Sequence, residues 1–178
     1  MLIKDRWYIA CPSARLASDK PFPFQVGDRK LVAFRDQEGA PQVLDDRCPH
    51  RAVPLSLGRV EQGKLSCGYH GWVFDGEGEC ISVLSEGPNS RIPGKVQARQ
   101  YPTQTLKGMV FVWTGDSEPA PIQEDVPEEF FENESQVLYR IADWPVDWRV
   151  ALENSMDSHV YYVHRDTILM FARGPLDP

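Results

Sequence analysis

The chain has no long run of apolar residues and no excess of basic charge. Its longest apolar stretch, around Met109 to Trp113, is much too short to cross a bilayer. Because 26 acidic residues outnumber 19 Lys and Arg, the formal net charge is −7, and nothing favours binding to nucleic acid. We therefore expect no membrane span and no nucleic-acid partner.

Three further absences bear on the cellular location, on dinucleotide binding and on disulfide formation. The N-terminus carries Lys4, Asp5 and Arg6 and lacks the apolar core of a secretory signal, so we expect a cytoplasmic location. No Gly-rich dinucleotide fingerprint occurs, so we expect no dinucleotide-binding site in this chain. Cysteine is scarce, and although Cys11 and Cys80 could pair on paper, disulfides are rare in a reducing compartment. We expect these two residues to be small buried thiols in strands.

Two short runs combine cysteine with histidine. Cys48-Pro49-His50 and Cys67-Gly68-Tyr69-His70 are separated by sixteen residues. Zinc fingers, the main alternative, usually pair Cys with Cys and His with His. A Rieske-type [2Fe–2S] cluster instead needs two Cys on one iron and two His on the other. The mixed order therefore predicts such a cluster, with the ligands Cys48, His50, Cys67 and His70.

The residues around these ligands resemble the N-terminal Rieske domain of the Rieske non-haem iron oxygenases, in the terminal oxygenase (alpha) subunit. The matching stretches are Cys48 to Arg51, Pro54 to Gly58, Gly63 to Leu65, Tyr69 to Trp72, Phe74-Asp75, Gly78 and Cys80. Trp7-Tyr8 is similar to the opening strand of that domain, and Tyr101-Pro102 with Gly108 to Trp113 to its closing strands. The resemblance runs from about Trp7 to about His164 and implies an oxidoreductase.

Gly and Pro separate many short runs with strand character, and no long helical pattern occurs before residue 145. Two hairpins are expected, Lys30 to Arg35 with Gln42 to Asp45, and Trp72 to Asp75 with Cys80 to Val83. Ser85 to Gly94 is rich in Gly, Pro, Ser and Asn and is expected to be a loop. The fold class that follows is mainly β, an antiparallel β domain with the cluster loops at one end.

A change in composition after Trp113 indicates a domain boundary. From Glu118 to Glu134 the chain has seven acidic residues and three prolines, which favours a solvated crossing segment. We expect a Rieske domain at residues 1–116, an acidic, Pro-containing linker at 117–140, and the first part of a catalytic domain at 141–178. By the resemblance, this last part is the beginning, a helix, of an α+β mononuclear-iron domain.

A second group of metal-binding residues follows the linker. His159 and His164, preceded by Asn154 and Asp157, resemble the mononuclear-iron motif of the same oxygenases. The resemblance implies that both His and a distant carboxylate hold Fe(II) and leave positions open for dioxygen. On an ideal helix the two His would lie about 140° apart, so the helix must widen into a π-bulge or break. The alternative is an amphipathic helix with surface histidines.

Asp157 has two possible roles. By family position it is the bridging carboxylate that links a cluster His of one subunit to an iron-ligand His of its neighbour. The family commonly has two residues between this Asp and the first His, whereas only Ser158 separates Asp157 from His159. Asp157 and His164 lie a heptad apart and would share a helical face, so Asp157 could bind iron instead.

Only fourteen residues follow His164, and the expected third iron ligand is not found among them. We therefore expect a piece of a longer oxygenase. The resemblance implies electron delivery by a ferredoxin and/or an NAD(P)H-dependent reductase, a homotrimer when intact, and O2 with a small organic, aromatic substrate. The reaction implied is hydroxylation, dihydroxylation or demethylation. The alternative function is a Rieske ferredoxin-type electron carrier without oxygenase activity.

Overall fold

The structure of the chain is a computed structural model that describes residues 3–139, 141 and 144–156. The chain divides into two compact units, Met1–Val137 and Leu138–Pro178. Among the described residues, every strand belongs to the first unit, and the α-helix α1 (Trp148–Met156) belongs to the second. None of the described helices has the length and apolar character needed to cross a membrane. The prediction of a mainly β fold is confirmed.

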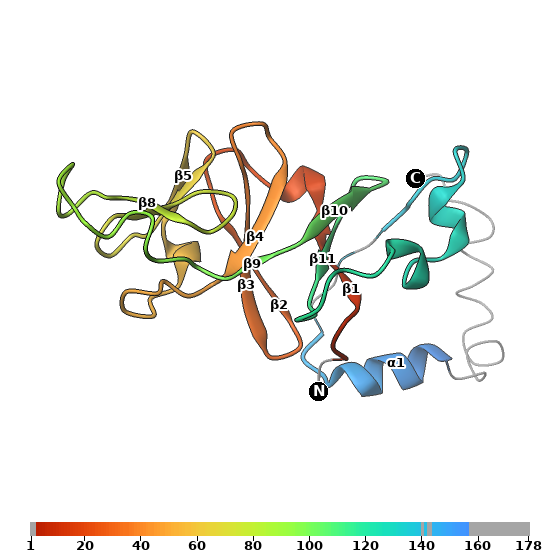
Figure 1. The fold of residues 1–178 in the computed structure, drawn as a ribbon. Helices are drawn as coiled ribbons and strands as arrows, with labels where there is room; N and C mark the ends of the chain where they lie inside the picture. Colours follow the sequence, from red (N-terminus) through yellow and green to blue (C-terminus); the bar gives the residue numbers. More distant parts are fainter. Residues whose placement is uncertain (1–2, 140, 142–143, 157–178) are drawn as a thin grey trace, which may run out of the picture. The chain divides into compact units, whose positions relative to one another are not determined.

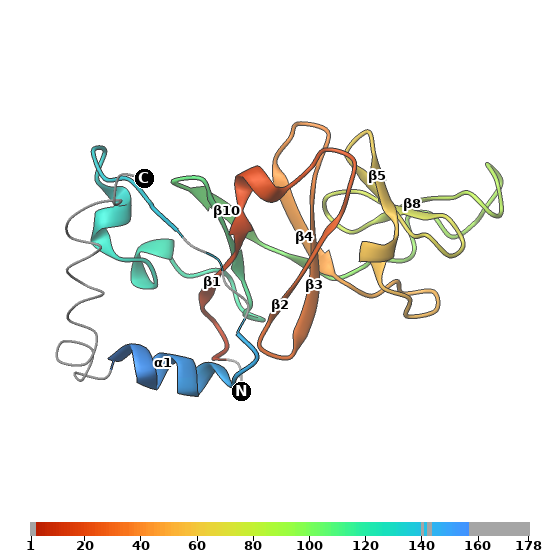
Figure 2. The same ribbon diagram turned by 180° about the vertical axis from the view of Figure 1, so that it is seen from behind.

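The first unit contains three antiparallel sheets. The first sheet has the order β1 (Trp7–Pro12), β11 (Met109–Trp113), β10 (Thr103–Leu106). The second has the order β2 (Phe22–Val26), β3 (Arg29–Arg35), β4 (Pro41–Asp45), β9 (Gln100–Tyr101). The third has the order β5 (Arg59–Glu61), β6 (Lys64–Ser66), β7 (Trp72–Phe74), β8 (Cys80–Val83). Figures 1 and 2 show the third sheet at one end of this unit, beyond the second sheet.

Both predicted hairpins are confirmed, as β3 with β4 and β7 with β8. An aspartate side chain closes each turn: Asp36 accepts the N–H of Ala40, and Asp75 accepts the N–H groups of Glu77 and Glu79. Such turns favour Asp because its short carboxylate reaches backbone amides a few residues ahead. The segment Ser85 to Gly94 contains no strand or helix, as its composition predicts.

A buried cluster lies beneath the third sheet and supports the two Cys/His runs. Its largest fully buried side chains are Phe34, Leu44, Leu55, Leu65 and Phe74. Cys48, Cys67 and Cys80 belong to the same cluster, so the predicted thiol ligands are anchored in the core. Cys11 lies in β1 within a second cluster, and neither Cys11 nor Cys80 forms a disulfide. The expectation of small buried thiols is confirmed.

The acidic segment after Trp113 differs from its prediction. It forms two short 3-10 turns, η3 (Ile122–Glu124) and η4 (Glu128–Phe131), rather than a solvated crossing. Ile122 and Val126 are buried at 5% and 7% exposure against Trp7 and Phe111. The composition was misleading because most of the acidic side chains face solvent while a few apolar residues between them supply a packed face. Asp125 is the exception, since its carboxylate is 10% exposed and accepts the N–H of Trp7 at 2.8 Å. The division between the two units falls after Val137, inside the predicted linker.

Tyr101 in β9 contacts the end of β4, the strand that leads into the first Cys/His run. Its hydroxyl donates a 2.6 Å hydrogen bond to Asp45, and the guanidinium groups of Arg29 and Arg99 lie 5.7 and 4.8 Å from its ring centroid. Burial, with the hydrogen bond to Asp45 and the charge of that carboxylate, raises the pKa of Tyr101 to about 12. The neighbouring arginines act in the opposite direction.

This raised pKa predicts a loss of stability at high pH. The unfolded chain releases the Tyr101 proton near pH 10, whereas the folded protein holds it to about 12, so the contribution is complete below pH 10 and disappears as pH rises through 12. We expect the free energy of unfolding to fall by about 2 kcal/mol more in the native protein than in Tyr101→Phe between roughly pH 9.5 and pH 11.5. Denaturant titrations at the two pH values measure this difference. Equal losses in both proteins would refute the assignment.

Candidate metal centre

The first Cys/His run lies on a loop between β4 and the 3-10 turn η2 (Leu55–Leu57). Cys48 closes this loop through its backbone, donating its N–H to Val53 and accepting the N–H of Ala52, both at 2.8 Å. The Asp46 carboxylate receives the N–H and the hydroxyl of Ser56, both at 2.7 Å. The two ends of the loop are therefore tied together on either side of the predicted ligands.

The second run lies on the tight connection between β6 and β7. Cys67 donates its N–H to Trp72 at 2.8 Å and accepts the N–H of Gly71 at 3.1 Å. Gly71 has a φ of +64°, which favours glycine. A Cβ at Gly68 would lie 2.8 Å from the carbonyl oxygen of Leu57, so a glycine there lets this loop pack against the chain after the first one.

The structure brings the two predicted thiol ligands together. Cys48 and Cys67 are 2% and 4% exposed, and the Cys67 thiol lies near enough to influence the pKa of Cys48. The pKa of Cys48 is raised to about 11, chiefly by burial and also by the Cys67 thiol, while the backbone amides of His50 and Arg51 lower it. These amides can stabilise a sulfur that carries negative charge. The Gly71 amide is not among these donors, because it is used within its own turn.

The two predicted imidazole ligands also lie side by side. The ring centroids of His50 and His70 are 4.8 Å apart, with their planes at 58°. Nδ1 of His70 is buried and has no hydrogen-bond partner, the one such side-chain nitrogen or oxygen among the residues that the structure describes. Because buried polar atoms are normally paired, this nitrogen is left for a ligand that accepts its lone pair.

The four side chains fit a [2Fe–2S] cluster. Two neighbouring thiols and two neighbouring imidazoles match the donor set of such a cluster, in which each iron takes one kind of donor. Within the described part of the chain, no three His, Cys, Asp or Glu side chains converge as they would around a single ion. The residues instead form two pairs.

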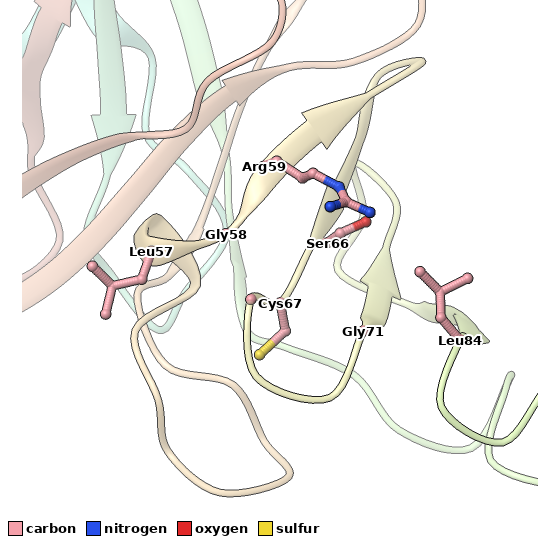
Figure 3. Close-up of a pocket in the computed structure, with 8 residues that line it drawn as sticks. Leu57, Gly58, Arg59, Ser66, Cys67, Gly71 and Leu84 are labelled. Atoms are coloured by element: carbon pink, nitrogen blue, oxygen red, sulfur yellow. The ribbon is translucent and has the colours of Figure 1, made fainter.

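A surface groove of about 310 Å³ runs beside Cys67. Leu57 and Leu84 lie on either side of it, and Arg59, Ser66 and Gly71 complete most of its wall. In Figure 3 the sulfur of Cys67 points into the space between its own loop and the loop that ends at Leu57. The predicted cluster position is therefore close to the surface, with exposed apolar side chains beside it.

The predicted mononuclear site lies elsewhere in the sequence. Asp157, His159 and His164 fall outside the described residues, as does the expected π-bulge. Helix α1 includes Asn154, the polar residue that precedes them. Their roles remain predictions.

Two residues of the site were missed by sequence reasoning. Asp46 fastens the first loop, and Trp72 stacks on His50 with ring centroids 4.8 Å apart and planes at 6°. Trp72 lies in the stretch that carries the family resemblance, but nothing in the sequence showed which ring it faces. Asp46 had no signal beyond its place just before the first run.

The two hydrogen bonds that Asp46 accepts from Ser56 lead to a prediction about stability. Replacing Asp46 with alanine removes both acceptors of Ser56, and hydrogen bonds to charged groups contribute about 1.5–3 kcal/mol each. We expect Asp46→Ala to lower the free energy of unfolding by about 2–3 kcal/mol, measured by urea denaturation. Asp46→Asn keeps one acceptor and should lose less. Ala at the exposed Asp28 is the control, and equal midpoints for Asp28→Ala and Asp46→Ala would contradict the prediction.

Comparisons with known proteins agree with this geometry. Residues 6–102 match the family described as Rieske [2Fe-2S] domain, and residues 113–175 match the family described as homotrimeric ring hydroxylase. The chain is 38% identical to the vanillate O-demethylase oxygenase subunit of a Pseudomonas species, covering 94% of this chain and 47% of that protein. It is 36% identical to chlorophyllide a oxygenase of Chlamydomonas reinhardtii, covering 97% of this chain and 26% of that protein.

Solved structures show the same relationship. The terminal oxygenase of carbazole 1,9a-dioxygenase from Nocardioides aromaticivorans superposes with a TM-score of 0.85 at 30% identity, over 98% of this chain and 48% of that one. The matched family covers more than half of the sequence, so the chain belongs to the Rieske [2Fe–2S] domain family. Within it, the relatives named above are Rieske oxygenases, as the sequence resemblance implied. The chain spans between about a quarter and a half of their length.

Proposed function

We propose that this protein accepts electrons, one at a time, through a Rieske [2Fe–2S] cluster. Cys48 and Cys67 hold one iron, and His50 and His70 hold the other. The observation that carries this proposal is a pair of buried thiols and a pair of imidazoles on adjacent loops, with the buried Nδ1 of His70 unpartnered. When bound, the cluster supplies one-electron transfer at a raised potential, because neutral imidazoles replace two thiolates.

The chain's own groups prepare this site in three ways. The amides of His50 and Arg51 face the Cys48 sulfur and favour its charged form. Burial keeps water from both thiols, while the surface position of His50 leaves a short path for an electron from a partner. The hydrogen bonds of Cys48 and Cys67 within their loops set the spacing of the sulfurs before any metal arrives.

We extend the proposal to oxygen chemistry in the region from residue 113. The match to homotrimeric ring hydroxylases over 113–175 supports it. His159 and His164 hold a mononuclear Fe(II), a type of site that activates O2, and Asp157 bridges the electron path between subunits of a homotrimer. The related proteins are named for vanillate, carbazole and 3-chlorobenzoate, which supports a small aromatic substrate that is hydroxylated, dihydroxylated or demethylated.

The electron donor in this proposal is a ferredoxin and/or an NAD(P)H-dependent reductase. Solved structures of carbazole 1,9a-dioxygenase in complex with a ferredoxin support that choice. A cytoplasmic setting fits the four free thiols. We also retain the order of a Rieske domain, a connection and the start of a catalytic domain, at residues 1–116, 117–140 and 141–178. The first part of the connection packs on the first sheet through Ile122 and Val126. A ferredoxin-type carrier would have no use for the segment that matches ring hydroxylases, so the oxygenase is favoured.

Metal analysis combined with low-temperature EPR of the dithionite-reduced protein tests the proposal. We expect acid-labile sulfide and the low average g-value of a Rieske cluster, with a third iron that His159→Ala removes. Two irons that are unaffected by His159→Ala would support the electron carrier instead. A protein that binds only zinc would refute both functions.

A further inference from the structure

Trp72 connects the two ligand loops. Its backbone carbonyl accepts the N–H of Cys67 at 2.8 Å, so it helps to fold the second loop. Its indole lies parallel to the imidazole of His50, which belongs to the first loop. A single residue therefore contacts one predicted ligand of each iron.

The surroundings of Trp72 leave its ring little freedom. It is 6% exposed and packs in the buried cluster that contains Phe74 and Cys48. Its backbone pairs with Val83 across β7 and β8. His50, in contrast, lies on an exposed part of its loop. The buried indole thus covers one face of the His50 imidazole, a ring that otherwise contacts His70 and lies on an exposed residue.

We propose that Trp72 is a positioning residue that fixes the plane of the His50 imidazole and lowers the reduction potential of the cluster. This inference rests on the proposed role of His50 as an iron ligand. Two ferric ions, two sulfides and two thiolates sum to zero charge, so the electron accepted from a donor leaves the reduced cluster with one negative charge. The face of an indole carries partial negative charge, and its burial excludes water. Both effects disfavour the reduced form, since solvent exposure and nearby charge set the potential of such clusters.

Removal of the ring is therefore expected to raise the midpoint potential. In Trp72→Leu and Trp72→Met, the ratio of reduced to oxidised cluster at a fixed solution potential should rise about tenfold. For a one-electron couple this is a rise of ~59 mV in the midpoint potential. Pulsed EPR should show changed 14N couplings for one of the two histidines, because the His50 ring is free to turn. Trp72→Phe keeps a stacking ring and should restore the native couplings, with a potential between those of the native and Leu proteins.

Phe74→Leu is the matched control. Phe74 is a fully buried aromatic of the same strand and the same cluster, so this variant loses core packing without touching the predicted ligands. It should keep the native potential and couplings. If the Trp72→Leu and Trp72→Met variants do not bind iron, the test rests on Trp72→Phe. A midpoint potential of Trp72→Phe at or below the native value then overturns the proposal.

Dithionite titrations and pulsed EPR on the full chain with its cluster test the ligand assignment and the role of Trp72 separately. A native protein with a Rieske signal, together with Leu and Met variants that keep its potential and couplings, overturns the role of Trp72 alone. A native protein without a Rieske signal overturns the ligand assignment and the role of Trp72 together. A raised potential with altered couplings, reversed by Phe and absent in Phe74→Leu, is the supporting result.

Discussion

Alanine at Cys67 is expected to give a protein without its two cluster irons, whereas alanine at Cys80 should leave both irons in place. The two thiols are matched in burial, at 4% and 0% exposure, and they belong to the same buried cluster. They differ in what they face. Cys67 lies next to the Cys48 thiol, while Cys80 lies in β8 with its sulfur 3.6 Å from the carbonyl oxygen of Ser82. The pair of variants therefore separates a ligand from a core thiol.

The reduced-state EPR signal and the content of iron and acid-labile sulfide measure this effect. Cys67→Ala should lose at least nine-tenths of the EPR signal and of the sulfide, together with the two cluster irons, because a cluster iron that loses a thiolate is no longer held by two protein donors. His70→Ala should behave in the same way, since it removes the unpartnered buried nitrogen. The sheet content should persist in circular dichroism, because two of the three buried clusters contain no predicted ligand. Retention of the cluster signal and sulfide by Cys67→Ala, or their loss from Cys80→Ala, would contradict the assignment.

The parts of the fold that the sequence predicted correctly depend on local chemistry. The Asp36 and Asp75 turns and the strands beside them are specified within a dozen residues, so both hairpins could be placed. The choice of Cys48, His50, Cys67 and His70 rested on the order of donor types, which needs no knowledge of the fold. The structure adds that the two thiols are neighbours and that the two imidazoles are neighbours, on adjacent loops.

The parts that could not be predicted depend on contacts between distant residues. The stacking of Trp72 on His50 and the bond from Ser56 to Asp46 join separate segments, and no local pattern encodes them. Composition was a poor guide to the acidic segment for a related reason. Most of its charged side chains lie on the solvent side and dominate the composition. Ile122 and Val126, four residues apart, lie on the side that packs on the sheet, which the composition does not reveal.

A chain that ends at Asp116, the predicted end of the Rieske domain, is expected to be less stable than one that ends at Val137. The segment 117–137 buries Ile122 and Val126 against the first sheet, and full burial of such side chains stabilises by about 1.5–3 kcal/mol each. It also accepts the indole N–H of Trp7 at Ala120. We expect the shorter chain to lose about 3–6 kcal/mol of its free energy of unfolding, measured by urea titration.

The double variant Ile122→Ala with Val126→Ala in the longer chain is the control for this prediction. It removes the buried side chains but keeps the backbone, so it should reproduce most of the loss caused by cutting after Asp116. Ala at the exposed Glu128 of the same segment should change the midpoint little. Equal midpoints for chains ending at Asp116 and Val137 would show that the segment is a linker after all. A large loss would place the stable boundary of the β domain after Val137, because apolar packing rather than charge decides where the domain ends.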